Sequence, residues 1–573
     1  MNAFAGAPLA ALWIVGLVVA APLLRGGPRL ADRARDAIVI GVAIPLVLGV
    51  LHLLYWPLCW VALVLCVAGS FAWRRNDRAF REPMPYLLFG MLALVAWPQL
   101  VQPALDGNTL AHHLPTAASW VHAHGIWTTQ TRYWWYPPAS ELFASALYAV
   151  STPFALGYAG FVALALLSLR IYAWAREGAH LPTRYADAFA AAVCAIAPLA
   201  LQAGSLQNDV WLAAFVVEIL WSAPVDDVTV LRSAALCALL KPDGWIYAAI
   251  ALAASGAKPR AWAIAIAAAF AWVVRDTLLW HSAFVPAGTL GLAHLWRSTM
   301  LAHPEASLAL GFAAAAKYAP LAVLLLLAAL ASPRLARDSP LASAGIACVI
   351  VALVMPFGFA DASAHLAGTS ALRYFAPAIV VGALVLAPHL RALPHWSLWI
   401  VLGAAIVEGL GVLSIFWNDR AALVALVAAL AVPLGIAALR RTQTRWTFAI
   451  AAGALVVITT VLASRTPVRF VSDALAVRGQ RSGVYAWIAR AHPPRIAGWG
   501  LQTGAIALLS PRTTIADVPD ADPCGHAQRI KATLIALAEP GHTSRFNRSR
   551  IHEAALCGRV LYRDPLAIAV DPL

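Results

Sequence analysis

Runs of predominantly apolar residues repeat along the first four-fifths of the chain, separated by short polar segments. Because a helix rises about 1.5 Å per residue, roughly 20 such residues cross the hydrocarbon core of a bilayer. The pattern predicts membrane-spanning helices at about 10–24, 37–55, 57–73, 85–101, 155–174, 186–201, 209–222, 261–275, 306–330, 341–358, 373–390, 396–416, 421–438 and 446–463.

Two shorter apolar runs, at 229–240 and 245–255, lie between the spans predicted at 209–222 and 261–275. The residues Lys241-Pro242-Asp243-Gly244 separate them, and proline and glycine both end helices. We therefore expect a short helical hairpin with Lys241 in its turn.

Basic residues gather in the short segments between the apolar runs, as they do in cytoplasmic loops. When every basic cluster is taken as cytoplasmic, the orientation alternates without conflict over about sixteen crossings. Both termini and the loops near 102–154, 202–208, 276–305 and 360–372 then lie outside. The cytoplasmic loops are those containing Arg25, Arg29, Arg33 and Arg35; Arg74, Arg75, Arg78 and Arg81; Arg170, Arg176 and Arg184; Lys258 and Arg260; Arg334 and Arg337; and Arg440, Arg441 and Arg445.

Composition supports the membrane interpretation. The chain is 61% hydrophobic and 12% charged, with a mean hydropathy of +0.74, whereas soluble domains carry about a quarter charged residues. The net charge of +14 is explained by the basic loops, so no nucleic-acid partner is predicted. No CxxC or Cys/His spacing suggests zinc, and the first apolar run lacks the basic leader of a cleavable signal peptide.

The last hundred residues differ in composition and predict a separate small α/β domain on the outer face. Its cysteines, Cys524 and Cys557, would lie in an oxidising compartment, so a disulfide between them is expected. The chain thus divides into N-terminal helices (1–84), a transmembrane core (85–464) and an outer domain (465–573). Within the last, strands are predicted at 495–499, 560–562 and 567–570, and helices at 482–491 and 526–537.

The first outer loop, 102–154, carries an unusual set of polar and aromatic residues. Asp106 follows a predicted span, His113 lies in a short amphipathic segment, and Trp135 and Tyr136 precede a Pro-Pro turn that leads to Glu141. An acid at the membrane surface, followed by this arrangement, indicates a reaction vestibule rather than a simple connector.

The pattern Asp-x6-His-Leu-Pro, then Trp, then Tyr-Pro-Pro-x2-Glu resembles the first periplasmic loop of bacterial GT-C glycosyltransferases. The most similar group is family 39-like, which includes protein O-mannosyltransferases and the lipid A aminoarabinose transferase. The resemblance implies an all-α polytopic membrane bundle of about 14–16 helices in the bacterial inner membrane. It also implies that Asp106 is the catalytic carboxylate of an inverting transfer from a polyprenyl-phosphate sugar to a periplasmic acceptor. The family often places a second acid here, where this chain has Gly107.

Three further segments resemble sequence patterns that recur in the same family: Gln207-Asn208-Asp209, Leu240-Lys241-Pro242 and Arg373-Tyr374. The resemblance places Asn208 and Asp209 at the substrate site, together with His113, Trp135, Tyr136 and Glu141. A carboxylate suits proton uptake from an acceptor hydroxyl, and cations suit a departing phosphate. The guanidinium of Arg373 can donate two parallel hydrogen bonds to that phosphate, and the ammonium of Lys241 provides a single positive charge.

Several alternatives stay open from the residues alone. Asp106 could cap a helix at the interface, Arg373 and Lys241 could anchor helix ends, and the aromatic residues could form an interfacial belt. Histidines in the two outer loops leave a divalent metal possible, although no motif indicates one. A transporter or flippase of a lipid-linked glycan is the main alternative function, but no two-fold repeat is present. A structural membrane protein with a periplasmic binding module would leave the loop motif unexplained.

Overall fold

The structure is a computed structural model of the 573-residue chain. It describes residues 3–24, 27, 29–72, 83–100, 104, 106, 108–131, 134–222, 227–280, 319–337, 339–354, 372–392, 394–413, 483–500, 503–518, 522–537 and 545–572. The spans predicted at 421–438 and 446–463, and the outer loop predicted at 276–305 beyond Trp280, lie outside these residues.

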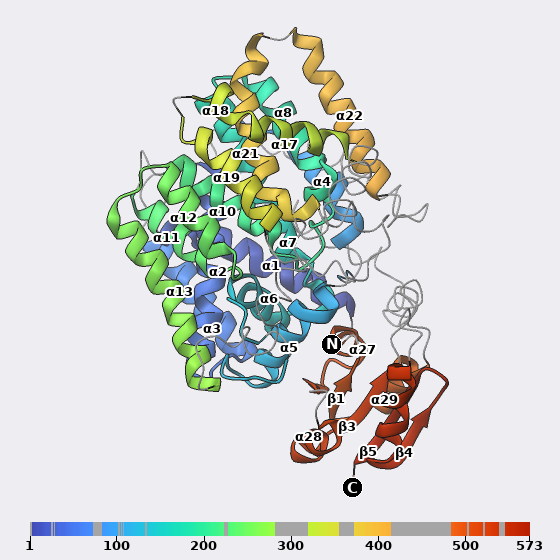
Figure 1. Ribbon diagram of the computed structural model, residues 1–573. Coiled ribbons are helices and arrows are strands. Elements are labelled where there is room, and N and C mark those ends of the chain that lie inside the picture. The colour runs from blue at the N-terminus through green and yellow to red at the C-terminus, as the bar shows by residue number, and fades with distance from the viewer. Residues whose placement is uncertain are drawn as a thin grey trace.

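A helical bundle and a small sheet domain make up the described molecule (Figure 1). The N-terminal helices are α1 (Ala3–Ala20), η1 (Ala21–Leu24), α2 (Leu30–Val50), α3 (Trp56–Ala72) and α4 (Tyr86–Leu100). The loop and middle elements are η3 (Thr109–His113), α5 (Leu114–His122), α6 (Ala139–Val150), η4 (Pro153–Ala155), α7 (Tyr158–Ala173), η5 (Trp174–Gly178), α8 (Thr183–Ala195), α9 (Ala197–Ala200), α10 (Asp209–Ser222), α11 (Asp227–Ala238), α12 (Gly244–Ala254) and α13 (Pro259–Trp280). The last helices of the bundle are α17 (Pro320–Leu330), α18 (Ser332–Leu335), α19 (Leu341–Val354), η9 (Leu372–Phe375), α21 (Ala376–Leu386), η10 (Ala387–Ala392) and α22 (His395–Leu413).

Helix α10 lies at the centre of the bundle and packs on α7, α11, α12 and α21. Apart from Asp209 and Glu218 it is apolar on all sides, and Trp211 and Phe215 are fully buried within it. A helix that is hydrophobic all round belongs in the core of a larger assembly. Helix α13 instead exposes Ile266, Phe270 and Leu278, as a helix at the lipid boundary does.

Four of the described helical segments are long and apolar enough to cross a membrane: Gly6–Leu24, Pro153–Gly178, Pro259–Leu279 and Leu372–Ala392. Shorter apolar helices accompany them, and the hairpin predicted around Lys241 is formed by α11 and α12. The polytopic helical bundle predicted from the hydrophobic pattern is therefore confirmed.

Two of the arginines assigned to cytoplasmic loops have buried side chains inside helices. Arg35 is inside α2 and Arg170 is inside α7, and both side chains are buried. Arg170 donates hydrogen bonds to Asp32 and Glu218 at 2.7–3.0 Å. The loop assignment was wrong for these two because acids on the same or a neighbouring helix neutralise them, which permits charge inside the bundle.

The C-terminal domain is a five-stranded sheet in the order β2-β1-β3-β5-β4. β1 pairs in parallel with β2 and β3, whereas β5 runs antiparallel to β3 and β4. The small α/β domain predicted beyond the bundle is thus present. Its elements are α26 (Val484–Ala491), β1 (Arg495–Trp499), α27 (Thr503–Leu509), β2 (Thr514–Asp517), α28 (Pro523–Arg529), β3 (Thr533–Leu537), α29 (Arg545–Ala555), β4 (Gly558–Arg563) and β5 (Ala567–Pro572).

The helix predicted at 526–537 is wrong in its second half. α28 ends at Arg529, Lys531 adopts a positive φ of 52°, and the next segment is the central strand β3. Leu534 to Leu537 are buried between β1 and β5. A short apolar run reads equally well as helix or buried strand from sequence.

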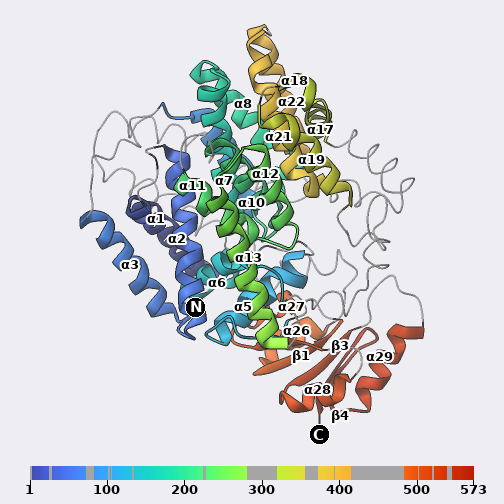
Figure 2. The ribbon, with the colours of Figure 1, turned by 60° about the vertical axis from the view of Figure 1, so that its left-hand side comes forward.

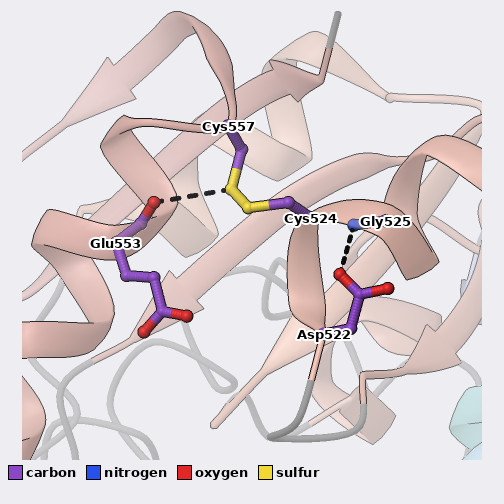
Figure 3. The surroundings of a disulfide bond; sticks show 5 residues. All are labelled: Asp522, Cys524, Gly525, Glu553 and Cys557. Atoms are coloured by element: carbon purple, nitrogen blue, oxygen red, sulfur yellow. Dashed lines mark hydrogen bonds between the residues drawn. A yellow bond between two sulfur atoms is a disulfide. The ribbon is translucent and has the colours of Figure 1, made fainter.

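A disulfide joins Cys524, in α28, to Cys557, which follows α29 (Figure 3). Their Cα atoms are 5.4 Å apart. The Asp522 carboxylate accepts from the Gly525 amide at 2.9 Å and so caps α28 beside the bridge. This hydrogen bond to the charged form holds the pKa of Asp522 below its usual value.

The C-terminal domain contacts the first outer loop of the bundle (Figure 2). His122 and Tyr148 both donate to the carbonyl of Pro511, at 2.9 and 3.0 Å. Burial lowers the pKa of His122, so its ring is neutral at pH 7 and donates through Nε2–H. At Gly504 the backbone approaches Leu110 so closely that a Cβ would lie 2.5 Å from its carbonyl oxygen. The domain therefore packs directly on the segment that follows Asp106.

Candidate active site

Asp106 lies just before the π-helix η3 and accepts hydrogen bonds from two directions. The Thr109 amide donates to Oδ1 at 2.9 Å, and the Thr109 hydroxyl donates to Oδ2. Gln207, from the segment before α10, donates to Oδ1 at 3.0 Å. The spacing Asp-x-x-Thr is a helix-capping pattern, so Asp106 has the capping geometry as well as a half-buried carboxylate.

Thr109 also connects Asp106 to the segment 202–208, which lies before α10. Its hydroxyl accepts from the Leu206 amide at 3.0 Å while donating to the carboxylate. Thr109 and the segment 202–208 therefore hold the Asp106 carboxylate from both sides, and its orientation is fixed before any ligand binds.

Asp209 is the first residue of α10 and is shared by two cations. Lys241 Nζ lies 2.6 Å from Oδ1, and Arg373 Nε lies 3.7 Å from Oδ2. Lys241 also contacts Asp243 at 3.1 Å. The neighbouring Asn208 donates to the carbonyl of Leu240 at 3.0 Å and so fixes the turn that carries Lys241.

Arg373 lies in η9, at the start of α21, with 8% of its surface exposed. It donates from Nη2 to the Tyr374 hydroxyl at 2.8 Å. Its Nε makes no hydrogen bond to any described residue. Asp106 is close enough to interact electrostatically with Arg373. One end of the bundle thus brings together four predicted site residues from separate segments: Asp106, Asp209, Lys241 and Arg373.

The other predicted residues of the loop form their own contacts. His113 Nδ1 lies 2.5 Å from Glu141, which also accepts from Ser140 at 2.8 Å. Both members of this pair are buried, so they tie η3 to α6. Their assignment as substrate ligands stays a prediction.

Trp135 and Tyr136 are half-buried, with ring centroids 4.4 Å apart in an edge-to-face arrangement. Trp272 of α13 donates to the Trp135 carbonyl at 3.1 Å. Arg275, also of α13, donates to the carbonyls of Trp134 at 2.8 Å and Ile126 at 3.2 Å. Helix α13 therefore fixes the position of the aromatic turn.

Sequence reasoning did not assign a role to Thr109, Asp243, Tyr374 or Arg275. The capping spacing could have indicated Thr109, and the position of Asp243 two residues after Lys241 could have indicated a second partner for that lysine. Nothing in the local pattern indicates that Arg275 holds this turn, because the carbonyls of Ile126 and Trp134 lie more than 140 residues away. Among the described residues, no group of three or more His, Cys, Asp or Glu side chains could hold a metal ion.

No protein-family model matches the chain, and no curated protein is significantly similar to it in sequence. Similarity is found among solved structures. The crystal structure of ArnT from Cupriavidus metallidurans bound to undecaprenyl phosphate aligns with a TM-score of 0.50, at 16% identity, over 84% of this chain and 97% of ArnT. The fold is that of ArnT.

ArnT in the apo state aligns with a TM-score of 0.44, at 17% identity, over 83% of this chain and 95% of ArnT. At such identity the bound ArnT structure establishes the architecture alone. It confirms the polytopic helical architecture that the sequence led us to expect.

Proposed function

We propose that this chain is an inverting membrane glycosyltransferase. It would move a sugar from a polyprenyl-phosphate donor to an acceptor at the periplasmic face of a bacterial inner membrane. The observation that carries the proposal is that Asp106, bound by Gln207, and the buried Arg373, beside Asp209, both lie at the start of α10 in a bundle with the fold of ArnT. The bound ArnT structure contains undecaprenyl phosphate, a lipid of the proposed donor class.

Asp106 is proposed as the general base. A carboxylate offers about four acceptor positions, and Thr109 and Gln207 occupy three of them. The remaining position can take the acceptor's hydroxyl proton. The acceptor oxygen then bonds to the anomeric carbon as the bond from that carbon to the phosphate oxygen breaks, and polyprenyl phosphate leaves with the electron pair.

Arg373 and Lys241 are proposed to bind the donor phosphate. Arg373 makes no hydrogen bond to a described carboxylate, since its contact with Asp209 is 3.7 Å. A phosphate would supply two oxygen atoms that accept hydrogen bonds from the Arg373 guanidinium. Lys241 is already balanced by Asp209 and Asp243, so its contribution would be mainly electrostatic.

The remaining predicted residues would shape the substrate site. Trp135 and Tyr136 present an aromatic pair that could stack on a sugar ring, while Asn208 orders the turn before Lys241. The buried pair of His113 and Glu141 would support the loop that carries Asp106.

The decisive variant is Asp106→Asn, because asparagine caps helices about as well as aspartate but is no base. Purified protein in proteoliposomes would be assayed with a panel of radiolabelled polyprenyl-phosphate sugars and periplasmic acceptors. We expect the variant to stay folded and to lose at least about a hundredfold in transfer. Near-full activity of Asp106→Asn would remove the assignment.

A second experiment distinguishes a glycosyltransferase from a flippase. Undecaprenyl phosphate should bind the wild-type chain, and a structure of that complex should place the phosphate beside Arg373 and within reach of Asp106. Translocation of labelled lipid between leaflets, without release of the sugar to any acceptor, would instead favour the flippase.

A further inference from the structure

A cavity of about 290 Å³ lies at the end of the bundle away from Asp106. Helix α21 connects the two ends, because Arg373 precedes it and η10, which carries Arg391, follows it. The cavity opens between the start of α8, the end of η10 and the start of α22, which lie together in Figure 1 far from the C-terminal domain.

The lining of this cavity combines apolar walls with a basic rim. Leu181, Leu390 and Leu398 contribute to the walls, while His180 and Arg391 are exposed at the rim. No aspartate or glutamate is among the described residues that line it. The cavity is therefore suited to an anion attached to an apolar chain.

Exposed tryptophans indicate the depth of the cavity in the membrane. Trp396 and Trp399 flank the lining residues Ser397 and Leu398 on α22, and they are 64% and 46% exposed. Tryptophan is enriched at the boundary between hydrocarbon and headgroups. The mouth of the cavity thus lies at the level of lipid phosphates, in the leaflet opposite the active site.

We propose that this cavity binds an anionic phospholipid. Arg391 pairs with its phosphate, His180 lines the headgroup, and one acyl chain lies along the wall formed by Leu181 and Leu398. Basic pockets between transmembrane helices bind anionic headgroups in this manner. The apolar walls favour a lipid over free phosphate, because water-soluble phosphate would leave them without a contact. The inference does not depend on glycosyl transfer.

The test uses the full chain, purified in neutral detergent. Dioleoylphosphatidylglycerol is titrated against it, with retained lipid counted by native mass spectrometry and the unfolding midpoint followed in parallel. Dioleoylphosphatidylcholine and inorganic phosphate are the comparison probes. The variants are Arg391→Ala, Arg391→Glu and Ser397→Trp, with Arg334→Ala as the matched control because Arg334 is exposed but does not line the cavity.

We expect the wild type to prefer phosphatidylglycerol to phosphatidylcholine and to gain little from inorganic phosphate. Arg391→Ala should weaken phosphatidylglycerol binding about fivefold, as loss of one interfacial cation does, and Arg391→Glu should weaken it more. Ser397→Trp should reduce binding without any change of charge, because the indole fills the cavity. Arg334→Ala should bind as the wild type does.

Three outcomes would overturn the proposal: unchanged lipid affinity in Arg391→Ala, an equal loss in Arg334→Ala, or equal stabilisation by inorganic phosphate and phosphatidylglycerol. The second would indicate a general surface-charge effect, and the third a site for soluble anions.

Discussion

Two clusters of buried charge occupy different levels of the bundle and differ in how their arginines are paired. In the Arg170 cluster (Asp32, Arg35, Asp36, Arg170 and Glu218), Arg170 makes three hydrogen bonds to carboxylates. In the Arg373 cluster (Asp106, Asp209, Lys241, Asp243 and Arg373), Arg373 makes none to a described carboxylate. Among the described residues Arg170 Nη1 also makes no hydrogen bond, but its other nitrogens are paired with acids, whereas no nitrogen of Arg373 donates to a carboxylate.

Helix α10 contributes an acid to each cluster, Asp209 at its first residue and Glu218 nine positions later. At about 1.5 Å per residue the two acids are roughly 13 Å apart along the axis. The members of the Arg170 cluster lie within helices, whereas those of the Arg373 cluster lie at helix ends and turns. Charge inside helices here links the bundle together, and charge at helix ends forms the site proposed above.

Arg170→Leu should have the largest effect on stability. It leaves Asp32 and Glu218 buried without their main partner, which costs about 3–5 kcal/mol. Thermal or denaturant unfolding of the purified protein measures the loss. The control Arg232→Ala removes a partly exposed cation 3.6 Å from Asp36 and should cost less than about 1 kcal/mol. Wild-type stability of Arg170→Leu would show that this cluster does not hold the bundle together.

Arg373→Ala should instead reduce donor use with little change in stability. Loss of charge-assisted hydrogen bonds to the phosphate predicts a roughly 10- to 100-fold fall in transfer at low donor concentration. Arg373→Lys should recover only part of this, because an ammonium cannot reproduce the fork. The measurement is transfer rate against donor concentration with acceptor saturating. An unchanged donor dependence in Arg373→Ala would make Arg373 an interfacial anchor only.

Lys241→Met should change donor use in the same direction but by less than about tenfold, since two acids already balance the lysine. The same variant should unfold more readily than Arg373→Ala, because Asp209 and Asp243 lose their shared cation. A larger donor effect than that of Arg373→Ala would reverse the proposed order of the two cations.

Gln207→Ala should have the smallest effect. It removes one hydrogen bond to Asp106 and should lower the transfer rate at saturating donor by about two- to tenfold, with stability unchanged. A loss as large as that of Asp106→Asn would mean that Gln207 acts in the chemistry itself.

The hydrophobic pattern predicted most described helices of the bundle, because lipid forces every span to be long, apolar and internally hydrogen-bonded. It also predicted three of the five strands, at 495–499, 560–562 and 567–570. The pairing inside the site could not be predicted, since Lys241 lies 32 residues from Asp209 and Gln207 lies 101 residues from Asp106. Which of these residues pair is determined by how the helices pack against one another.

The assignment of every basic cluster to a loop failed for a related reason. Arg35 and Arg170 are arginines of the kind that the pattern assigns to loops. Acids permit their burial: Asp32 and Asp36 on the same helix as Arg35, and Asp32 and Glu218 on the helices beside Arg170. The sequence alone therefore predicted the basic ends of the bundle better than its charged interior.

The contact of the C-terminal domain with the first outer loop has a consequence for biogenesis. His122 and Pro511 are 389 residues apart in the chain, and ribosomes add about 5–20 residues per second. Roughly 20–80 s therefore separate the synthesis of the loop that carries Asp106 from the synthesis of the surface that covers it. Until the C-terminal domain has been synthesised, Leu110 and its neighbours therefore lack the surface that covers them in the folded protein.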